Sequence, residues 1–308
     1  MNVIKKTLLL NETGEELAYC LKQLNATIGK RANGDISFTD LIEQENIKEI
    51  NNEYAIRVAN YIFKGCTNLT TVNLPNAISI GSYAFYGCTS LTAIKLPNAT
   101  EIYANAFSEC TKLTTIDLPN AISIGSETFY GCKNLTKIDL PNVIDMCDST
   151  FVNCTSLTTV DLRNVTSMHW NTFYGCTNLT TVDLRNVINM GDSTFVKCTS
   201  LITIDLPNAT SINGFNGCTA LTTVNLPKAI SIESYTFQHC ANLTNVILQS
   251  TTVCTLEGTN AFVDTPIANG TGYIYVPDAL VNDYKKATNW SAYANQIKPL
   301  SEYVESEE

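Results

Sequence analysis

The sequence predicts a right-handed parallel β superhelix, a solenoid in which short strands of successive repeats stack, with short helical caps at both ends. Two observations carry this prediction: cysteines recur at a fixed interval along most of the chain, and short polar–apolar alternations recur with them. One repeat cannot bury its apolar side alone, whereas stacked copies form a continuous core. The chain has 308 residues and is 44% hydrophobic, which suffices for such a core.

The cysteines set the period of the repeat. They lie 22 residues apart, except at one interval of 20 residues. The members of this ladder are Cys66, Cys88, Cys110, Cys132, Cys154, Cys176, Cys198, Cys218 and Cys240. Aligned on them, the chain follows C-x-x-L-x-x-[IV]-x-L-[PR]-N-[AV]-x-x-[IM]-x-x-x-x-F-x-x, as in "CTSLTAIKLPNATEIYANAFSE". The short interval is a two-residue deletion in "SINGFNGC", where Phe215 keeps its place before the cysteine.

Each repeat predicts a short strand followed by a second short segment. In "LTTVDL", Val182 and Leu184 alternate with Thr181 and Asp183, the period-two pattern of a strand with one buried and one solvated face. Pro or Arg, followed by Asn, ends the strand, and a segment such as "AISIGSYAF" follows. This period and the L-x-x-[IV]-x-L line fall within the range of leucine-rich repeats.

The Phe and Cys before this line resemble those of the BspA-type leucine-rich repeats of bacteria and some protozoa. The ending "GYIYVPDALVNDYKKATNWSAYANQIKPL" is similar to the C-terminal cap common in such proteins, and the resemblance covers about residues 47–300. It implies a curved solenoid, often secreted or at a bacterial cell surface, and often associated with adhesion or protein binding. No secretory signal or anchor motif is visible in the sequence.

The sequence divides into three predicted parts: an N-terminal helix or cap at 1–44, the solenoid at 45–262, and a C-terminal cap with an acidic tail at 263–308. The N-terminal part places Leu17, Leu21, Leu24 and Ile28 at helical spacing. This helix is expected either to cover the first repeat or to act in oligomerisation or anchoring, which leaves the oligomeric state open. No apolar run approaches the roughly 20 residues of a transmembrane helix, so membrane insertion is not expected.

The ladder cysteines are expected to be buried thiols. Adjacent copies in a parallel stack lie about 4.8 Å apart, whereas the Cβ atoms of a disulfide lie about 3.8 Å apart. Converging ligands at C-x-x-C or C…H spacing are not found, so neither a metal nor another cofactor is expected. An exposed row of carboxylates lacks the differing environments that separate a catalytic acid from a base, so no catalytic residue is expected.

A row of carboxylates is the first candidate binding site. Five successive strands place an aspartate before their second leucine, and four of these strands place a threonine two positions earlier. The residues are Asp117, Asp139, Asp161, Asp183 and Asp205, with Thr115, Thr159, Thr181 and Thr203. Aligned like charges on the concave sheet would attract a basic peptide, a cation or a hydroxyl-rich glycan. The alternative is that duplicated aspartates on a solvated strand serve solubility alone.

His169 and Trp170, in "SMHWNTFYGC", are secondary contact candidates. They occupy positions that mostly hold glycine and serine or aspartate in other repeats, on the side away from the acidic strands. Tryptophan is enriched in binding hot spots. The alternative is that these residues have no function and reflect neutral sequence change at a turn that accepts many residue types.

These patterns favour a non-enzymatic binding scaffold for a protein or glycan, acting in adhesion through the concave sheet. The alternative is a phage- or virion-associated structural or attachment protein assembled through its N-terminal helix. The net charge of −10 disfavours nucleic acid as a partner. It is compatible with a basic ligand.

Overall fold

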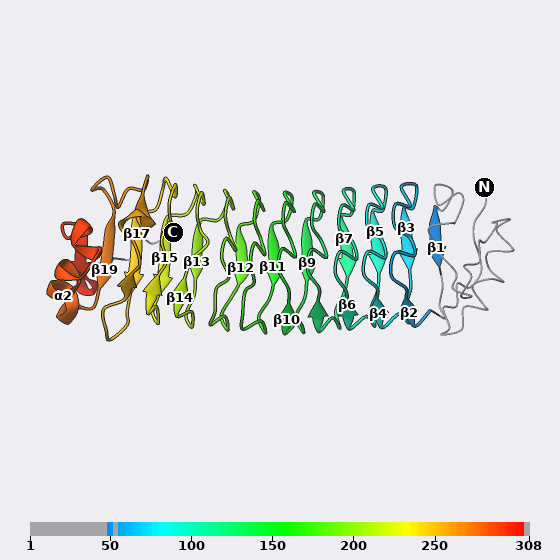
Figure 1. Ribbon diagram of the computed structural model, residues 1–308, viewed down its shortest axis with the longest axis horizontal. Helices are drawn as coiled ribbons and strands as arrows, with labels where there is room; N and C mark the ends of the chain where they lie inside the picture. Colours follow the sequence, from blue (N-terminus) through cyan, green and yellow to red (C-terminus); the bar gives the residue numbers. More distant parts are fainter. Residues whose placement is uncertain (1–47, 52–54, 305–308) are drawn as a thin grey trace, which may run out of the picture. The chain divides into compact units, whose positions relative to one another are not determined.

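The computed structural model describes residues 48–51 and 55–304, so the N-terminal segment with the predicted helix lies outside the described residues. The described part is a parallel β-solenoid with little helix, which confirms the predicted fold class. By its contacts the chain divides into two compact units, Met1–Asp161 and Leu162–Glu308. Each unit is described by itself below, and Figure 1 gives the labels.

Two series of strands alternate along the first unit. One series consists of β1 (Glu49–Asn51), β3 (Thr71–Asn73), β5 (Ala93–Lys95), β7 (Thr115–Asp117), β9 (Lys137–Asp139) and β11 (Thr159–Asp161). The shorter series consists of β2 (Arg57–Val58), β4 (Ser79–Ile80), β6 (Glu101–Ile102), β8 (Ser123–Ile124) and β10 (Asp145–Met146). Strands β1, β3, β5 and β7 form one parallel sheet, β9 pairs with β11, and the shorter series forms a second parallel sheet.

The second unit repeats this arrangement and adds a helical end. Its strands are β12 (Thr181–Asp183), β13 (Thr203–Asp205), β14 (Ser211–Ile212), β15 (Thr223–Leu226), β16 (Ser231–Ile232), β17 (Asn245–Leu248), β18 (Thr255–Leu256), β19 (Tyr273–Val276) and β20 (Ile297–Pro299). Its helices are η3 (Thr259–Phe262), η4 (Asp278–Leu280), α2 (Val281–Lys286), η5 (Trp290–Tyr293) and η6 (Leu300–Glu302). The sheet ordered β13-β15-β17-β19-β20 continues beyond residue 262, where the sequence predicts the cap to begin.

Strand pairing follows the sequence period. In the first unit, Val72 of β3 lies opposite Ile94 of β5, 22 positions later. In the second unit, Ile204 of β13 lies opposite Val224 of β15, only 20 positions later. The deletion therefore leaves the register of the sheet unchanged, because the two lost residues come from the turn that follows β14.

A stack of phenylalanine side chains runs through the core. Within each unit, the phenylalanine of one repeat is buried and stacks on that of the next, with ring centroids 5.2 Å apart for Phe63 and Phe85 and 5.7 Å apart for Phe107 and Phe129. In the second unit the centroids of Phe195 and Phe215 are 5.2 Å apart. Aromatic pairs at such offsets stabilise beyond their burial alone.

The cysteines lie beside this stack as thiols, as the sequence predicts. Ladder thiols donate to the carbonyl of the phenylalanine that precedes the previous ladder cysteine. Cys110 Sγ lies 3.1 Å from Phe85 O, and Cys240 Sγ lies 3.1 Å from Phe215 O. Cysteine thus combines the small apolar volume that the position requires with one weak donor.

Polar side chains fasten successive turns together. Asn98 and Asn120 donate from Nδ2 to the carbonyls of Pro75 and Pro97, each over 2.8 Å. In the second unit, Asn186 donates to the carbonyl of Arg163 over 2.7 Å. The asparagine after each strand therefore acts as a structural hydrogen-bond donor rather than as a ligand-binding group.

Candidate binding surface

The strands present the predicted aspartates and threonines on the face opposite the core. In β7, Thr115 and Asp117 are exposed while Ile116 between them is buried. In β13, Thr203 and Asp205 are exposed around the buried Ile204. The other predicted residues, on β9, β11 and β12, are exposed or half-buried. Within each unit, the structure therefore brings these residues to one solvated strand face.

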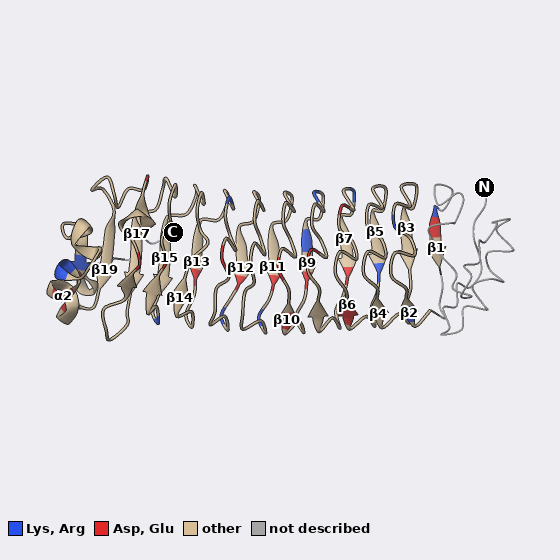
Figure 2. Ribbon diagram, in the orientation of Figure 1, with Lys and Arg blue, Asp and Glu red and all other residues tan. Residues whose placement is uncertain are grey.

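In the first unit, basic side chains interrupt the acidic row. Lys137 Nζ lies 3.0 Å from Asp139 Oδ2, and both side chains are largely exposed. Lys95 of β5 lies opposite Asp117 of β7 in the register, so a lysine occupies the aspartate position of the neighbouring strand (Figure 2). The face is thus less acidic than five aligned aspartates would predict.

In the second unit, Asp183 is held by a neighbouring guanidinium. Arg185 Nε and Nη2 donate to Asp183 Oδ1 and Oδ2 over 2.9 and 2.6 Å, a bidentate pair. These hydrogen bonds lower the pKa of Asp183 below its usual value, against a smaller opposing effect of desolvation. Asp205 accepts a hydrogen bond from Asn225 Nδ2 over 3.3 Å, and no described cation lies within ion-pair distance of it.

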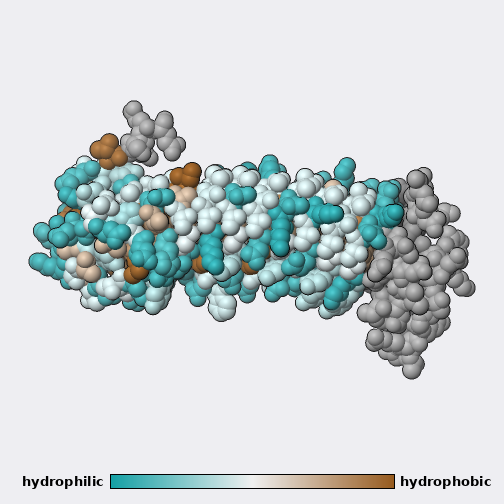
Figure 3. Space-filling model, turned by 90° about the horizontal axis from the view of Figure 1, so that it is seen from above, coloured by the Kyte–Doolittle hydropathy of each residue, from teal (hydrophilic) through white to brown (hydrophobic). Residues whose placement is uncertain are grey.

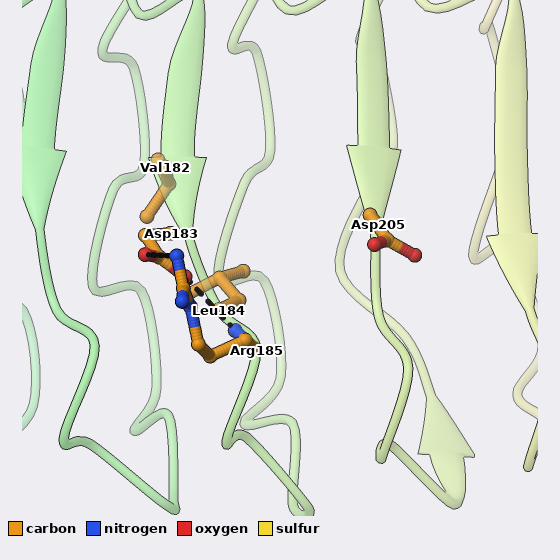
Figure 4. A pocket seen from close by; sticks show the side chains of 5 residues that line it. All are labelled: Val182, Asp183, Leu184, Arg185 and Asp205. Atoms are coloured by element: carbon orange, nitrogen blue, oxygen red, sulfur yellow. Dashed lines mark hydrogen bonds and ion pairs between the residues drawn. The ribbon is translucent and has the colours of Figure 1, made fainter.

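A shallow cavity of about 290 Å³ lies beside this ion pair (Figure 4). It is lined by Val182, Asp183, Leu184, Arg185 and Asp205. Because the guanidinium already binds one carboxylate, the charge left to a ligand is chiefly that of Asp205. A single lysine or arginine side chain of a partner would meet this charge.

His169 and Trp170 lie on a different segment, the turn between Met168 and Thr172, and both are exposed. The Trp170 side chain is 62% exposed, and the His169 carbonyl accepts a hydrogen bond from Thr172 Oγ1 over 2.7 Å. The pair therefore lies away from the strand face that carries the aspartates, where the repeat alignment also places it. Their role as a contact stays a prediction.

Burial raises the pKa of the ladder thiols. Desolvation raises the pKa of Cys110 to about 12, and it also raises the pKa of Cys132 and Cys198. Cys147, off the ladder, is half-buried, and its pKa is raised by desolvation and by the nearby Asp145 charge. A thiol with a raised pKa is protonated at neutral pH, when it is a poor nucleophile and a poor metal ligand.

The described residues contain no group of three or more His, Cys, Asp or Glu side chains placed to hold a metal ion. None of their helices has the length and apolar character needed to cross a membrane. On the face drawn in Figure 3, hydrophobic residues are scattered among polar ones.

Two features were missed by reading the sequence. The threonine just before each strand is structural: Thr92 Oγ1 donates to the carbonyl of Thr70 over 3.1 Å, and Thr114 Oγ1 to that of Thr92 over 3.0 Å. The pair of adjacent threonines in many repeats was the sequence signal: the first bonds to the neighbouring turn, and the second begins the strand and is solvent-exposed. The second feature is a cavity of about 600 Å³ at the deletion after β14. The 20-residue interval was its only sequence signal.

The fold and its regular exposed strand face define a solenoid of the leucine-rich repeat class. The chain belongs to the BspA-type leucine-rich repeat family: the model of the "BspA type Leucine rich repeat region (6 copies)" matches residues 26–145, 56–169, 122–214 and 166–272. The family resemblance of the sequence is thereby confirmed.

Two solved structures are similar to this chain. A leucine-rich repeat protein from Bacteroides ovatus is 22% identical with a TM-score of 0.52, covering 83% of this chain and 78% of that one. A leucine-rich repeat protein of T. pallidum is 30% identical with a TM-score of 0.49, covering 57% of this chain and 87% of that one. Among curated proteins, none matches this sequence significantly.

Proposed function

We propose that this protein is a non-enzymatic scaffold that binds a protein segment with basic side chains through the exposed strand face. Membership of a leucine-rich repeat family supports an interaction scaffold in general. The observation that carries the specific proposal is the pattern of β7 and β13, where an exposed threonine and an exposed aspartate flank a buried isoleucine. Because neighbouring strands within a unit lie about 4.8 Å apart, the exposed side chains of successive strands can bind an extended partner without a pocket.

The charge on this face favours a basic partner over an acidic one. Asp117 and Asp205 have no described cation within ion-pair distance, whereas Asp139 and Asp183 are paired with Lys137 and Arg185. The unneutralised aspartates attract lysine or arginine, and the threonine hydroxyls donate or accept hydrogen bonds beside them. We expect such binding to act in adhesion to another protein or cell.

Binding to an array of lysine-rich peptides and their lysine-to-alanine counterparts tests this proposal. Asp117→Asn and Asp205→Asn are each expected to weaken lysine-dependent binding about 1.4- to fivefold, since a surface ion pair contributes about 0.2–1 kcal/mol. The effect should shrink at high salt, because exposed charges are screened.

Asp145→Asn is the matched control, because Asp145 is an exposed aspartate on β10 of the other sheet. It removes the same charge from the first unit without changing the strand face. Equal weakening by Asp145→Asn would reduce the effect to net charge. Lysine-dependent binding that survives both Asp117→Asn and Asp205→Asn would show that this face is only a solvated surface.

A further inference from the structure

The deletion after β14 shortens an outer turn without disturbing the core. Regular turns place four residues between the buried residue of the short strand and the phenylalanine, whereas only Asn213 and Gly214 lie between Ile212 and Phe215. The core beneath is continuous: Phe215 lies 5.2 Å from Phe195 and 5.6 Å from Phe237 by ring centroids. The lost residues therefore leave a notch on the outside, a cavity of about 600 Å³ within the second unit.

The notch also interrupts a ladder of backbone hydrogen bonds. In regular turns, the residue with left-handed backbone donates its amide to a carbonyl of the next turn, as Asn105 N does to Ser126 O over 2.9 Å and Asn171 N to Asp192 O over 2.9 Å. Ser193 has the same left-handed backbone, with φ of 59°, but the residue that would accept from it is deleted.

One donor and one acceptor are consequently left at the walls of the notch. Among the described residues, none accepts a hydrogen bond from Ser193 N, and none donates to Ser234 O. Both residues line the cavity, one from the turn before the deletion and one from the turn after it. Ser193 is half-buried, and backbone groups so placed are nearly always paired in folded proteins, whereas Ser234 is exposed. The amide and the carbonyl are both therefore available to a ligand.

The floor carries a side chain whose orientation is determined by its neighbours. Asn213 is only 8% exposed, and its Nδ2 donates to Asp192 Oδ1 over 2.8 Å and approaches Met190 O at 3.5 Å. Both of these neighbours are acceptors, so the amide nitrogen must face them. Asn213 Oδ1 is therefore turned away, and no described donor reaches it.

Aromatic rings, carboxylates and hydroxyls complete the lining. Tyr235, 53% exposed, and Glu233 lie on one wall, and Tyr174 lies at the cavity with Lys197 Nζ 5.6 Å from its ring centroid. The lining contains the carboxylates of Asp192 and Glu233 but only one lysine, Lys197, so its charge disfavours an anionic ligand. Phenol rings beside closely spaced donors and acceptors suit a sugar ring, which has apolar C–H faces and hydroxyls that both donate and accept.

We propose that this notch binds a residue or two of a neutral glycan, on a surface separate from the strand face. Its volume falls within the about 300–1,000 Å³ typical of small-molecule sites. The sugar hydroxyls would accept a hydrogen bond from Ser193 N and donate one to Ser234 O, in place of the backbone hydrogen bonds that the deletion removes. The ring of Tyr235 would cover one face of the sugar.

Saturation-transfer NMR with lactose, maltose, cellobiose and N,N′-diacetylchitobiose tests the proposal on the full chain. At least one disaccharide is expected to bind, and Tyr235→Ala should weaken it by about tenfold or more, as for loss of a hot-spot aromatic. Tyr83→Ala is the matched control, because Tyr83 has the same left-handed backbone (φ 57° against 62°) in a regular turn of the first unit.

A second variant inserts Asp-Ser between Asn213 and Gly214, which restores the 22-residue interval and supplies the missing acceptor for Ser193 N. It should unfold at the same temperature as the parent chain or higher, and it should lose the disaccharide. Asp117→Asn should leave saccharide binding unchanged.

Three results would overturn the proposal. One is that none of the four disaccharides binds, and another is that binding persists in the insertion variant. The third is that the insertion abolishes binding to a peptide array instead, which would assign the notch to a protein partner.

Discussion

At the residue scale, one position of every repeat requires left-handed backbone, just before the ladder cysteine. Glycine occupies it in several repeats, with φ of 68° at Gly87 and 69° at Gly131, while Glu109 and Lys197 adopt φ of 59° and 62° at the same place. A residue with a Cβ pays about 1–2 kcal/mol for this conformation. The repeat therefore tolerates a local strain that the stack of neighbouring turns maintains.

Gly87→Ala should destabilise the fold, whereas Glu109→Gly should not. A Cβ at Gly87 would meet only Gly65 Cα, at 4.0 Å, so the cost is that of the backbone alone. Alanine also reduces the entropy of the unfolded chain, which offsets about 0.5–1 kcal/mol of this cost. Gly87→Ala should therefore lower the free energy of unfolding by about 0.5–1 kcal/mol. Glu109→Gly should leave it unchanged or raise it by up to about 1 kcal/mol. Urea unfolding measures both, and equal signs for the two variants would contradict the explanation.

At the element scale, the helical end of the second unit closes the phenylalanine stack. Phe262 is the last ring of the stack, and Tyr293 meets it edge-on with centroids 5.3 Å apart. Trp290 is fully buried and donates from Nε1 to Cys254 O over 2.6 Å, while Tyr284 Oη accepts from Cys254 N over 2.9 Å. The end of the stack is thereby shielded from water, as the terminal unit of a repeat array requires.

The two tryptophans of the chain give a direct test of this cap. Trp290→Ala should lower the free energy of unfolding by about 3–5 kcal/mol, because it removes a large buried side chain and the hydrogen bond to Cys254 O. Trp170→Ala, at an exposed turn, should change it by less than about 0.5 kcal/mol. Chemical denaturation followed by circular dichroism compares them, and a similar loss in both variants would refute the capping role.

At the scale of the whole molecule, the repeated thiols couple stability to alkaline pH. Burial raises the pKa of Cys110 from 9.0 to about 12 and also raises the pKa of Cys132, Cys198 and Cys218. Folding therefore retains protons that the unfolded chain releases above pH 9. The stability that these thiols contribute is complete below that pH and is lost as the pH rises toward the folded values.

Urea unfolding between pH 7 and pH 11 under reducing conditions should show this loss. The free energy of unfolding is expected to be level up to about pH 8 and to fall above pH 9, by up to about 1.4 kcal/mol per pH unit for each thiol. Cys110→Ala should make the decline less steep, since one such group is removed. An unchanged slope in Cys110→Ala would contradict the assignment to the thiols.

The predictability of the molecule from its sequence follows from the same repetition. The period determines which side chains are buried, so the strands, the cysteine ladder and the exposure of Asp117 and Asp205 could be predicted. The pairing of Lys137 with Asp139 and of Arg185 with Asp183 depends on side-chain conformation and could not. The notch at Asn213 could not be predicted either. It is lined by groups of the turns before and after the shortened turn, and the sequence of a single repeat does not show which of these groups become exposed.

The final strand also bears on self-association. Strand β20 is the last strand in the sheet order of the second unit, and it pairs with β19 on one side. It ends in Pro299, which has no amide hydrogen, and it carries the charged Lys298. An outer strand with proline and lysine is a poor template for another chain to add to. This end of the sheet therefore resists the edge-to-edge joining through which open β-sheets form fibrils.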